Sequence, residues 1–210
     1  MTTVLIDYDS GNLHSAQKAF ERMALEMGAG SVIVSSEADV VAAADRIVLP
    51  GDGAFPHCRD ALFGRTALAE AIVEAVTHRA VPFMGICVGM QMMATTGHEH
   101  ATTEGFDWID GDIQPIIAPS QKIPHMGWNN LIIDSPHPVL EGIKSGNHVY
   151  FVHSYAMNVT NLHQRLAHVD YAGDITAVVG RDNIIGMQFH PEKSQESGLR
   201  MIGNFLRWAP

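Results

Sequence analysis

The chain has 210 residues, of which 46% are hydrophobic and 17% are charged, and these proportions exclude disordered and fibrous classes. A formal net charge of −10 argues against nucleic acid or an anionic membrane surface as the main partner, because both bind clustered Lys and Arg. Two cysteines cannot form a disulfide framework, and neither a membrane-spanning run nor a secretion signal is apparent. We therefore expect one domain, residues 1–210, in the cytoplasm.

The N-terminal half alternates short apolar runs with helical patterns, which predicts βα units around a mainly parallel sheet flanked by helices. The expected strands cover residues 4–8, 31–34, 46–49 and 81–86. The expected helices cover residues 13–27, a short segment starting near Ser36, residues 66–79 capped by Thr66, and residues 90–95. The pattern indicates the α/β class.

From Trp108 onward, strands separated by Gly, Pro, Asn and Asp replace the helical periodicity, so the second half is predicted to be β-rich. Residues 148–153 form one expected strand, and residues 176–180 and 184–189 form an expected hairpin. A helix over residues 197–208 closes the chain. Because no internal repeat or long linker is present, we expect the two halves to share one core.

The segment Gly85-Ile86-Cys87-Val88-Gly89 places a cysteine between two glycines at a predicted strand-to-helix junction. This is the pattern of a nucleophile elbow, a sharp turn that lifts a reactive side chain into a cleft. The following helix N-terminus would favour a Cys87 thiolate, and the Val88 N–H would face the oxyanion of a tetrahedral intermediate. The same motif also fits a buried structural cysteine, which is the role we expect for Cys58.

The segment His190-Pro191-Glu192 supplies the two groups that a thiol nucleophile needs, a histidine base and a carboxylate that orients it. The chain order Cys, His, Glu differs from that of α/β-hydrolases, which argues against an esterase. The best candidate for a metal site is His98-Glu99-His100, but its spacing matches no familiar zinc motif. We therefore expect neither a metal nor another cofactor.

With both motifs present, the chain resembles the class I, triad-type glutamine amidotransferases, and among them the glutaminase subunits of imidazole glycerol phosphate synthases. The resemblance spans nearly the whole chain and is carried by residues 6–13, 49–55, 85–91, 124–129, 151–155 and 190–194. The run Pro124-His125-Met126-Gly127-Trp128-Asn129 discriminates best, because other amidotransferases do not require it.

This resemblance implies that Cys87 attacks the carboxamide of glutamine, that His190 protonates the departing ammonia, and that Glu192 orients His190. It also implies a heterodimer with a cyclase subunit that folds as a (β/α)₈ barrel. The cyclase would use the ammonia to make imidazole glycerol phosphate and aminoimidazole carboxamide ribonucleotide in histidine biosynthesis.

Other site residues follow from the same resemblance. Those implied to bind glutamine are Gln91, Ser154 and Tyr155. Those implied to donate to the oxyanion are Val88, Gly51 and Gly53. Those implied to face the cyclase are Asn12, Met126, Trp128 and Lys193. For each member of the last group, a structural role as a helix cap, a packed side chain or a solvated charge stays open.

Two positions depart from the family pattern, since Asp9 stands where the family usually has Gly and Asp52 where it usually has Val. Asp tolerates the positive φ expected at residue 9. The Asp52 carboxylate would oppose a developing oxyanion unless it points to solvent.

Two alternative functions are open at this stage. One is the glutaminase subunit of another synthase, such as that for vitamin B6 or anthranilate, and residues 124–129 argue against it. The other is a non-catalytic, DJ-1-like elbow protein whose cysteine senses oxidation. His190-Pro191-Glu192 argues against this second alternative.

Overall fold

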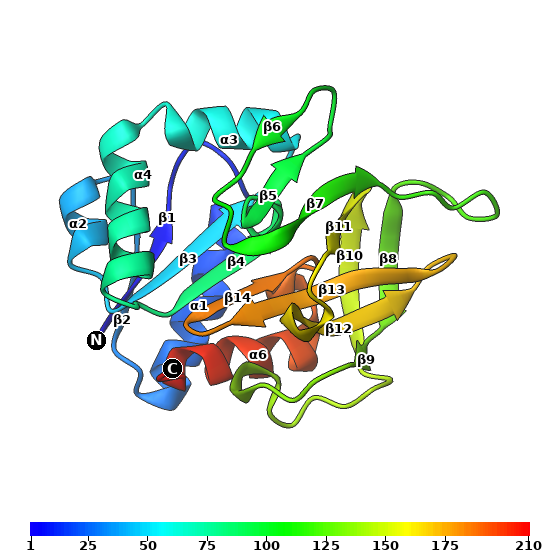
Figure 1. Ribbon diagram of the computed structural model, residues 1–210. Helices are drawn as coiled ribbons and strands as arrows, with labels where there is room; N and C mark the ends of the chain where they lie inside the picture. Colours follow the sequence, from blue (N-terminus) through cyan, green and yellow to red (C-terminus); the bar gives the residue numbers. More distant parts are fainter.

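The computed structural model describes residues 1–210 and contains a mixed eight-stranded sheet with the order β2-β1-β3-β4-β14-β13-β12-β9 (Figure 1). The parallel part consists of β1 (Thr2–Ile6), β2 (Ser31–Ser35), β3 (Arg46–Gly51), β4 (Phe83–Cys87) and β14 (Ile184–Met187). The antiparallel part consists of β13 (Asp174–Arg181), β12 (Arg165–Asp170) and β9 (Ile132–Ile133). Every residue of β3, β4 and β14 is buried, as expected of strands covered on both faces.

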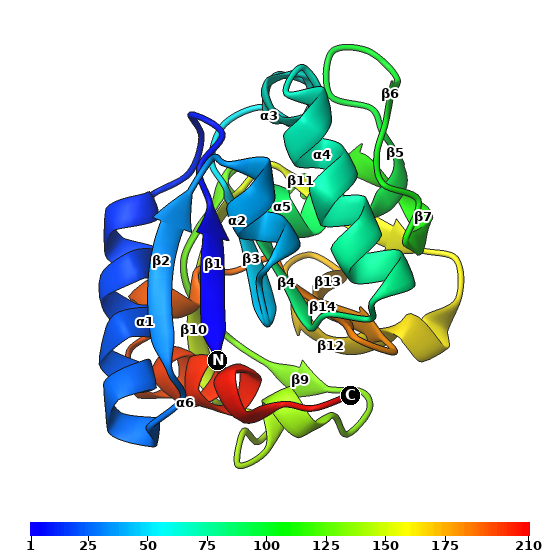
Figure 2. The same cartoon turned by 90° about the vertical axis from the view of Figure 1, so that its left-hand side faces the viewer.

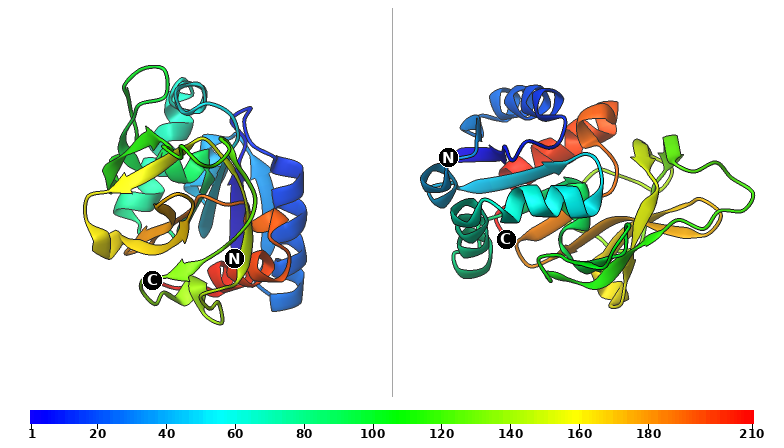
Figure 3. Two further views of the ribbon diagram at one scale, coloured as in Figure 1. Left: turned by 90° about the vertical axis from the view of Figure 1, so that its right-hand side faces the viewer. Right: turned by 90° about the horizontal axis from the view of Figure 1, so that it is seen from above.

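Helices cover both faces of this sheet. On one face α1 (Leu13–Met27) packs against α6 (Gln195–Arg207), and Figure 2 shows α1 alongside β1 and β2. On the other face lie α2 (Ala38–Ala42), α3 (Phe55–Phe63) and α4 (Thr66–Val73), which continues as a π-helical turn, η1 (Glu74–His78) (Figure 3). The predicted α/β class with helices on a mainly parallel sheet is confirmed, and no helix is both long and apolar enough to span a membrane.

The C-terminal half is β-rich, as predicted. One ribbon pairs β8 (His125–Asn130) with β10 (His148–His153), at the end of the molecule opposite β2 in Figure 1. A second sheet has the order β11-β7-β5-β6 and consists of β5 (Ala94–Gly97), β6 (Thr103–Glu104), β7 (Ile109–Pro115) and β11 (Tyr155–Val159). The 3-10 turns are η2 (Pro138–Leu140), η3 (Leu162–Gln164) and η4 (Pro191–Lys193). Only Ser154 separates β10 from β11, so one segment serves both sheets.

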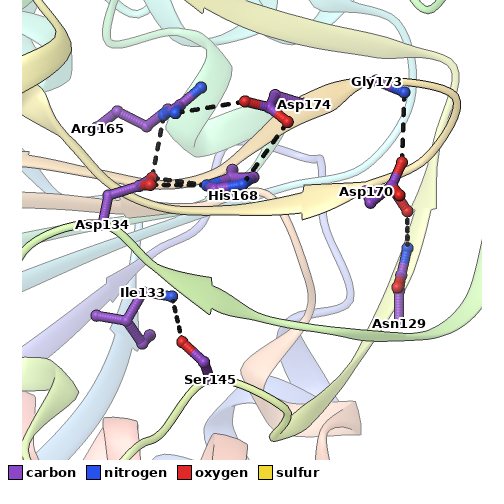
Figure 4. Close-up of polar contacts among 9 residues, drawn as sticks. All are labelled: Asn129, Ile133, Asp134, Ser145, Arg165, His168, Asp170, Gly173 and Asp174. Atoms are coloured by element: carbon purple, nitrogen blue, oxygen red, sulfur yellow. Dashed lines mark hydrogen bonds and ion pairs between the residues drawn. The ribbon is translucent and has the colours of Figure 1, made fainter.

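Ion pairs tie together the antiparallel edge strands of the large sheet (Figure 4). Asp134, just after β9, accepts from Arg165 at 3.0 Å and from His168 Nδ1 at 2.8 Å, both on β12. Arg165 also lies 3.6 Å from Asp174, the first residue of β13. The network therefore joins β9, β12 and β13. It adds to the backbone pairing of β9, which involves only two residues.

Two local expectations are wrong, and one helix was not predicted. The helix expected over residues 90–95 is the four-residue α5 (Val88–Gln91), after which residues 94–97 form β5, because the β-branched Thr95 and Thr96 pair into a sheet. Thr66 does not cap α4, whose N-cap is Arg65. Helix α3 was not predicted, and its Pro56 lies in the first turn, where the missing N–H costs nothing.

The two elbow glycines are required by close backbone approach. A Cβ at Gly89 would lie 1.8 Å from the carbonyl oxygen of Leu49, and one at Gly85 would lie 2.6 Å from the carbonyl oxygen of Gly89. Because real Cβ atoms do not approach oxygens this closely, any side chain at either position would push β3, β4 and α5 apart.

We predict that Gly89→Ala lowers the free energy of unfolding by at least about 3 kcal/mol, because the methyl group cannot be accommodated against the Leu49 backbone. Urea denaturation followed by circular dichroism measures this loss. The control is Gly28→Ala, where φ is 62° but no atom lies within 4 Å of the new Cβ, so only about 1–2 kcal/mol of left-handed strain is expected. Equal losses in the two variants would contradict the close-approach argument.

Candidate active site

Cys87 lies at the junction of β4 and α5, with φ 53° and ψ −113°, a backbone conformation that L-residues rarely adopt. The side chain is 4% exposed, and the residue pairs in register with Gly51 at the end of β3. The elbow predicted from the two glycines is therefore present, and it places the sulfur at the carboxyl edge of the parallel strands.

His190 and Glu192 meet in the turn η4, which follows β14. His190 Nδ1 lies 2.9 Å from Glu192 Oε1, and the two side chains are 4% and 2% exposed. His190 Nε2 is also buried and has no hydrogen-bond partner within the protein. With one ring nitrogen held by the carboxylate, the other is left for the nucleophile and a bound substrate.

Three effects set the protonation of His190. Burial by itself lowers its pKa, but the neighbouring Cys87 and Glu192 outweigh burial and raise this pKa to about 10. His190 next to a Cys87 thiolate is therefore an imidazolium at neutral pH, ready to donate a proton.

Hydrogen bonds to Tyr150 on β10 fix the position of His190. His190 N donates to the carbonyl of Tyr150 at 3.0 Å. Ser194 Oγ donates to the carbonyl of His190 at 2.6 Å and accepts from Tyr150 N at 3.0 Å. Ser194, which is 1% exposed, was not singled out from the sequence as a site residue, because nothing in a lone serine signals that it closes a turn on a distant strand.

A pocket of about 250 Å³ opens beside Cys87. It is lined by Asp52, Gly53, Cys87, Val88, Gln91, Glu99, Pro124, Val152, His153, Ser154 and Tyr155. The lining therefore brings together the nucleophile, Val88 and Gly53 of the oxyanion prediction, and all three residues implied to bind glutamine.

The orientation of Gln91 follows from its hydrogen bonds. Its Nε2 donates to the carbonyl of Tyr155 at 3.1 Å and to Gln188 Oε1 at 3.0 Å, which uses both N–H bonds. The Gln91 Oε1 atom is thus left to accept from a ligand in the pocket. Gln188, which is fully buried, directs its own Nε2 at the Cys87 sulfur, 3.8 Å away.

Glu99 is a pocket residue that the sequence did not identify as such. Its Oε2 accepts from the N–H of Phe55, the first residue of α3, at 2.7 Å. Of its two histidine neighbours, His98 lies 3.5 Å from Asp112, and the exposed His100 lies 4.0 Å from Glu99 Oε1. No group of three or more metal-ligating side chains converges in the structure. Glu99 lies in the loop after β5, and folding brings this loop to the start of α3, beside the pocket.

The strand from Gly51 to Gly53 has a defined peptide orientation. Asp52 N donates to Ser10 Oγ at 3.4 Å, and the Asp52 carbonyl accepts from Ser10 Oγ at 2.8 Å and from Cys58 Sγ at 3.4 Å. Because a trans peptide points its N–H opposite to its C=O, the Gly53 N–H is directed away from Ser10. Asp52 is an exposed residue that also lines the pocket, and Cys58 is a buried contact residue.

The four residues implied to face a partner differ in their settings. Met126 and Trp128 are 61% and 47% exposed on one face of β8, and the Trp128 ring meets that of Tyr150 edge-on with centroids 5.8 Å apart. Asn12 has a structural role, since its Oδ1 accepts from Ser15 N and caps α1. Lys193 is half-buried in η4.

We predict that Glu192→Gln lowers the pKa of His190, because the charge and hydrogen bond of Glu192 both raise it. The imidazolium is then lost at lower pH, so the alkaline limb of kcat/KM for the expected amide hydrolysis moves to lower pH, and kcat falls about 10²-fold. The control is Glu196→Gln on α6, whose side chain is 93% exposed. An alkaline limb that stays in place in Glu192→Gln would refute this role.

Comparison with known proteins identifies the family. The model of the class I glutamine amidotransferase family matches residues 4–208. Imidazole glycerol phosphate synthase subunits HisH from Ruegeria pomeroyi and Cereibacter sphaeroides are 62% and 65% identical to this chain, in each case over 100% of both chains. The corresponding subunit from Rhodospirillum rubrum is 51% identical, again over 100% of both chains.

Solved structures share the fold at low sequence identity. A glutamine amidotransferase structure superimposes with a TM-score of 0.74 at 14% identity, covering 98% of this chain and 99% of that one. A glutamine amidotransferase from Thermotoga maritima gives a TM-score of 0.63 at 14% identity, covering 91% of this chain and 76% of that one. Together with the relatives and the family match, they establish that the chain belongs to the class I glutamine amidotransferases, in the family of imidazole glycerol phosphate synthase HisH subunits.

Proposed function

We propose that the chain is the glutaminase subunit of an imidazole glycerol phosphate synthase, which hydrolyses glutamine and supplies ammonia for histidine biosynthesis. The observation that carries this proposal is the buried contact of His190 with Glu192 beside Cys87, in a chain 62% and 65% identical to two HisH subunits. The same relatives argue against the glutaminase of another synthase, and the His190–Glu192 contact argues against an elbow that only senses oxidation.

The chemistry requires no cofactor. The Cys87 thiolate attacks the carboxamide carbon of glutamine, and the C–O double bond opens to an oxyanion. The His190 imidazolium gives its Nε2 proton to the leaving nitrogen, so that ammonia departs and a γ-glutamyl thioester remains. His190, now neutral, takes a proton from water, which attacks the thioester. Collapse of this second intermediate returns the thiolate and releases glutamate.

Two backbone donors are proposed for the oxyanion. The Val88 N–H lies at the start of α5, directly after the nucleophile, where the helix N-terminus favours negative charge. The Gly53 N–H is the second candidate, since Ser10 and Cys58 hold the preceding carbonyl on the opposite side of the peptide. Gly51, at the end of β3, then serves to bring this strand beside Cys87.

The pocket offers complementary groups for the amino-acid end of glutamine. The free Oε1 of Gln91 and the Glu99 carboxylate are both acceptors, and they suit the α-ammonium group. The main chain around Ser154 and Tyr155 lies at the same pocket and is proposed to bind the α-carboxylate. Glu99 thus extends the substrate-binding set inferred from sequence.

The ammonia acceptor is proposed to be a cyclase subunit with a (β/α)₈ barrel fold, which forms a heterodimer with this chain and makes imidazole glycerol phosphate and aminoimidazole carboxamide ribonucleotide. Met126 and Trp128 are exposed apolar side chains on β8, which suits them to that interface. Asn12 and Lys193 are proposed to face the cyclase as well. A single cluster of 56 buried apolar residues supports one domain over residues 1–210. Two free cysteines support a cytoplasmic location.

We predict that Cys87→Ala abolishes glutamine hydrolysis, because no other nucleophile lies beside His190. A glutamine-mimicking electrophile such as a diazo-ketone should label wild-type Cys87 stoichiometrically, as measured by mass spectrometry. Cys58→Ala is the matched control, since Cys58 is buried against Ser10, and it should keep the label. Unchanged turnover in Cys87→Ala would exclude the mechanism.

A second prediction concerns the partner. If ammonia is delivered to a cyclase, hydrolysis by the isolated chain should be slow and should accelerate by at least about tenfold when the nucleotide-loaded cyclase is added, because hydrolysis without an acceptor wastes glutamine. Ammonia release in a coupled assay measures the rate. Replacing Trp128 by Asp should weaken the acceleration, whereas equal rates with and without the cyclase complex would contradict the proposed coupling.

A further inference from the structure

Two buried histidines connect β8 to the pocket. His125 and His153 are opposite each other in the β8–β10 register, and they are 2% and 6% exposed. His125 Nδ1 lies 2.9 Å from His153 Nε2, while His153 Nδ1 lies 2.9 Å from the carbonyl oxygen of Tyr155. Neither histidine takes part in the chemistry described above, although His153 lines the pocket.

The direction of each hydrogen bond can be derived from one fixed point. The Tyr155 carbonyl only accepts, so His153 Nδ1 carries a proton and, in a neutral ring, His153 Nε2 accepts. His125 Nδ1 must then donate, which makes His125 Nε2 an acceptor for Asn129 Nδ2 at 3.3 Å. The second N–H of Asn129 donates to the carbonyl of Asp170 at 3.1 Å (Figure 4). Every polar atom of the two rings is thereby paired.

The surroundings keep both rings neutral. His125 is stacked between the rings of Tyr171 and Phe151, with centroid distances of 4.0 and 4.6 Å. Burial lowers the pKa of His125 to about 4 and that of His153 to about 3. A second proton on either ring would place two N–H groups against each other and break the chain of hydrogen bonds.

At its other end, this series of hydrogen bonds reaches the Cys87 nucleophile. The Tyr155 carbonyl also accepts from Gln91 Nε2, which donates in turn to Gln188, and Gln188 faces the Cys87 sulfur. The Tyr155 carbonyl is therefore the shared acceptor where the histidine pair meets the residue proposed to bind the glutamine ammonium group. Displacing this carbonyl would turn the Gln91 amide and its free Oε1.

The other face of β8 is the surface proposed to meet a partner. Along this strand, Met126 and Trp128 are exposed, while His125 is buried and Asn129 is half-buried, which is the alternation of a strand with two different faces. A shift of β8 along or away from β10 would therefore move His125 and Asn129 together with the exposed side chains.

We propose that His125 and His153 are positioning residues for glutamine: as a tautomer-locked pair they hold the Tyr155 carbonyl that orients Gln91, and they tie this orientation to β8. The inference rests on the proposed glutamine site, because it acts through Gln91. His125 contributes by donating to His153 Nε2, which forces the Nδ1–H tautomer of His153 and so guarantees the donor to Tyr155.

Nuclear magnetic resonance of the wild-type complex with its cyclase subunit, with ¹⁵N-labelled histidine in this chain, tests the tautomers directly. Both residues should be Nδ1–H tautomers with unprotonated Nε2, and neither should titrate between about pH 5.5 and 8. The ring of His163 in η3, which lies on the surface, serves as the reference signal in the same spectra. An Nε2–H tautomer at either position, or titration of either ring in this range, would overturn the inference.

A double-mutant cycle tests the effect on glutamine. His125→Phe keeps the stacked ring but removes the donor, so the KM for glutamine should rise about three- to tenfold with kcat changed less than twofold. His153→Asn keeps an amide N–H at the Nδ1 position, which can donate to Tyr155 whatever residue 125 is. In the His153→Asn background, His125→Phe should have no further effect.

The same KM increase from His125→Phe in both backgrounds would show a merely structural role and overturn the proposal. His153→Gln, which keeps the acceptor for His125 but loses the donor to Tyr155, should raise KM as His125→Phe does. The control is His163→Asn in η3, which should leave KM unchanged. Failure of the proposed function itself would appear differently, as hydrolysis that survives Cys87→Ala in the otherwise unaltered complex.

Discussion

The left-handed backbone at Cys87 is the constraint on which the rest of the site depends. A non-glycine residue at φ 53° costs on the order of 1–3 kcal/mol, and the surrounding core must hold it there. It does so through backbone contact, since Gly89 lies directly against Leu49 and Gly85 against Gly89. The buried strands β3, β4 and β14 keep these backbones together, so the parallel sheet itself holds the sulfur at its carboxyl edge.

The β8–β10 ribbon is the second organising element, because it fixes both halves of the catalytic apparatus. At one position Tyr150 receives the His190 N–H and donates to Ser194, which sets the turn that carries the general acid. Three residues further along the same strand, His153 holds the Tyr155 carbonyl and thereby the orientation of Gln91. The general acid and the substrate-binding residue are thus both positioned by β10. This strand pairs with β8, which carries the exposed Met126 and Trp128.

The two departures from the family pattern are accommodated locally. Asp9 takes φ 66°, within the left-handed region that Asp tolerates, and its carboxylate pairs with Arg65. Asp52 is an exposed residue, and its peptide carbonyl accepts from Ser10 and Cys58. Negative charge in the exposed Asp52 side chain is screened by water, so it opposes an oxyanion much less than a buried carboxylate would.

The sequence by itself determined the α/β class, the elbow at Cys87 and the partnership of His190 with Glu192, because each depends on neighbours in the chain or on periodicity. It did not determine that residues 94–97 form a strand or that residues 55–63 form a helix, since sheet pairing and burial override local preference there. Gln188, Glu99, Ser194 and the His125–His153 pair were likewise decided only by the tertiary structure. These residues act on partners 28 to 101 positions away, and such contacts leave no pattern in the sequence because folding alone brings the strands together.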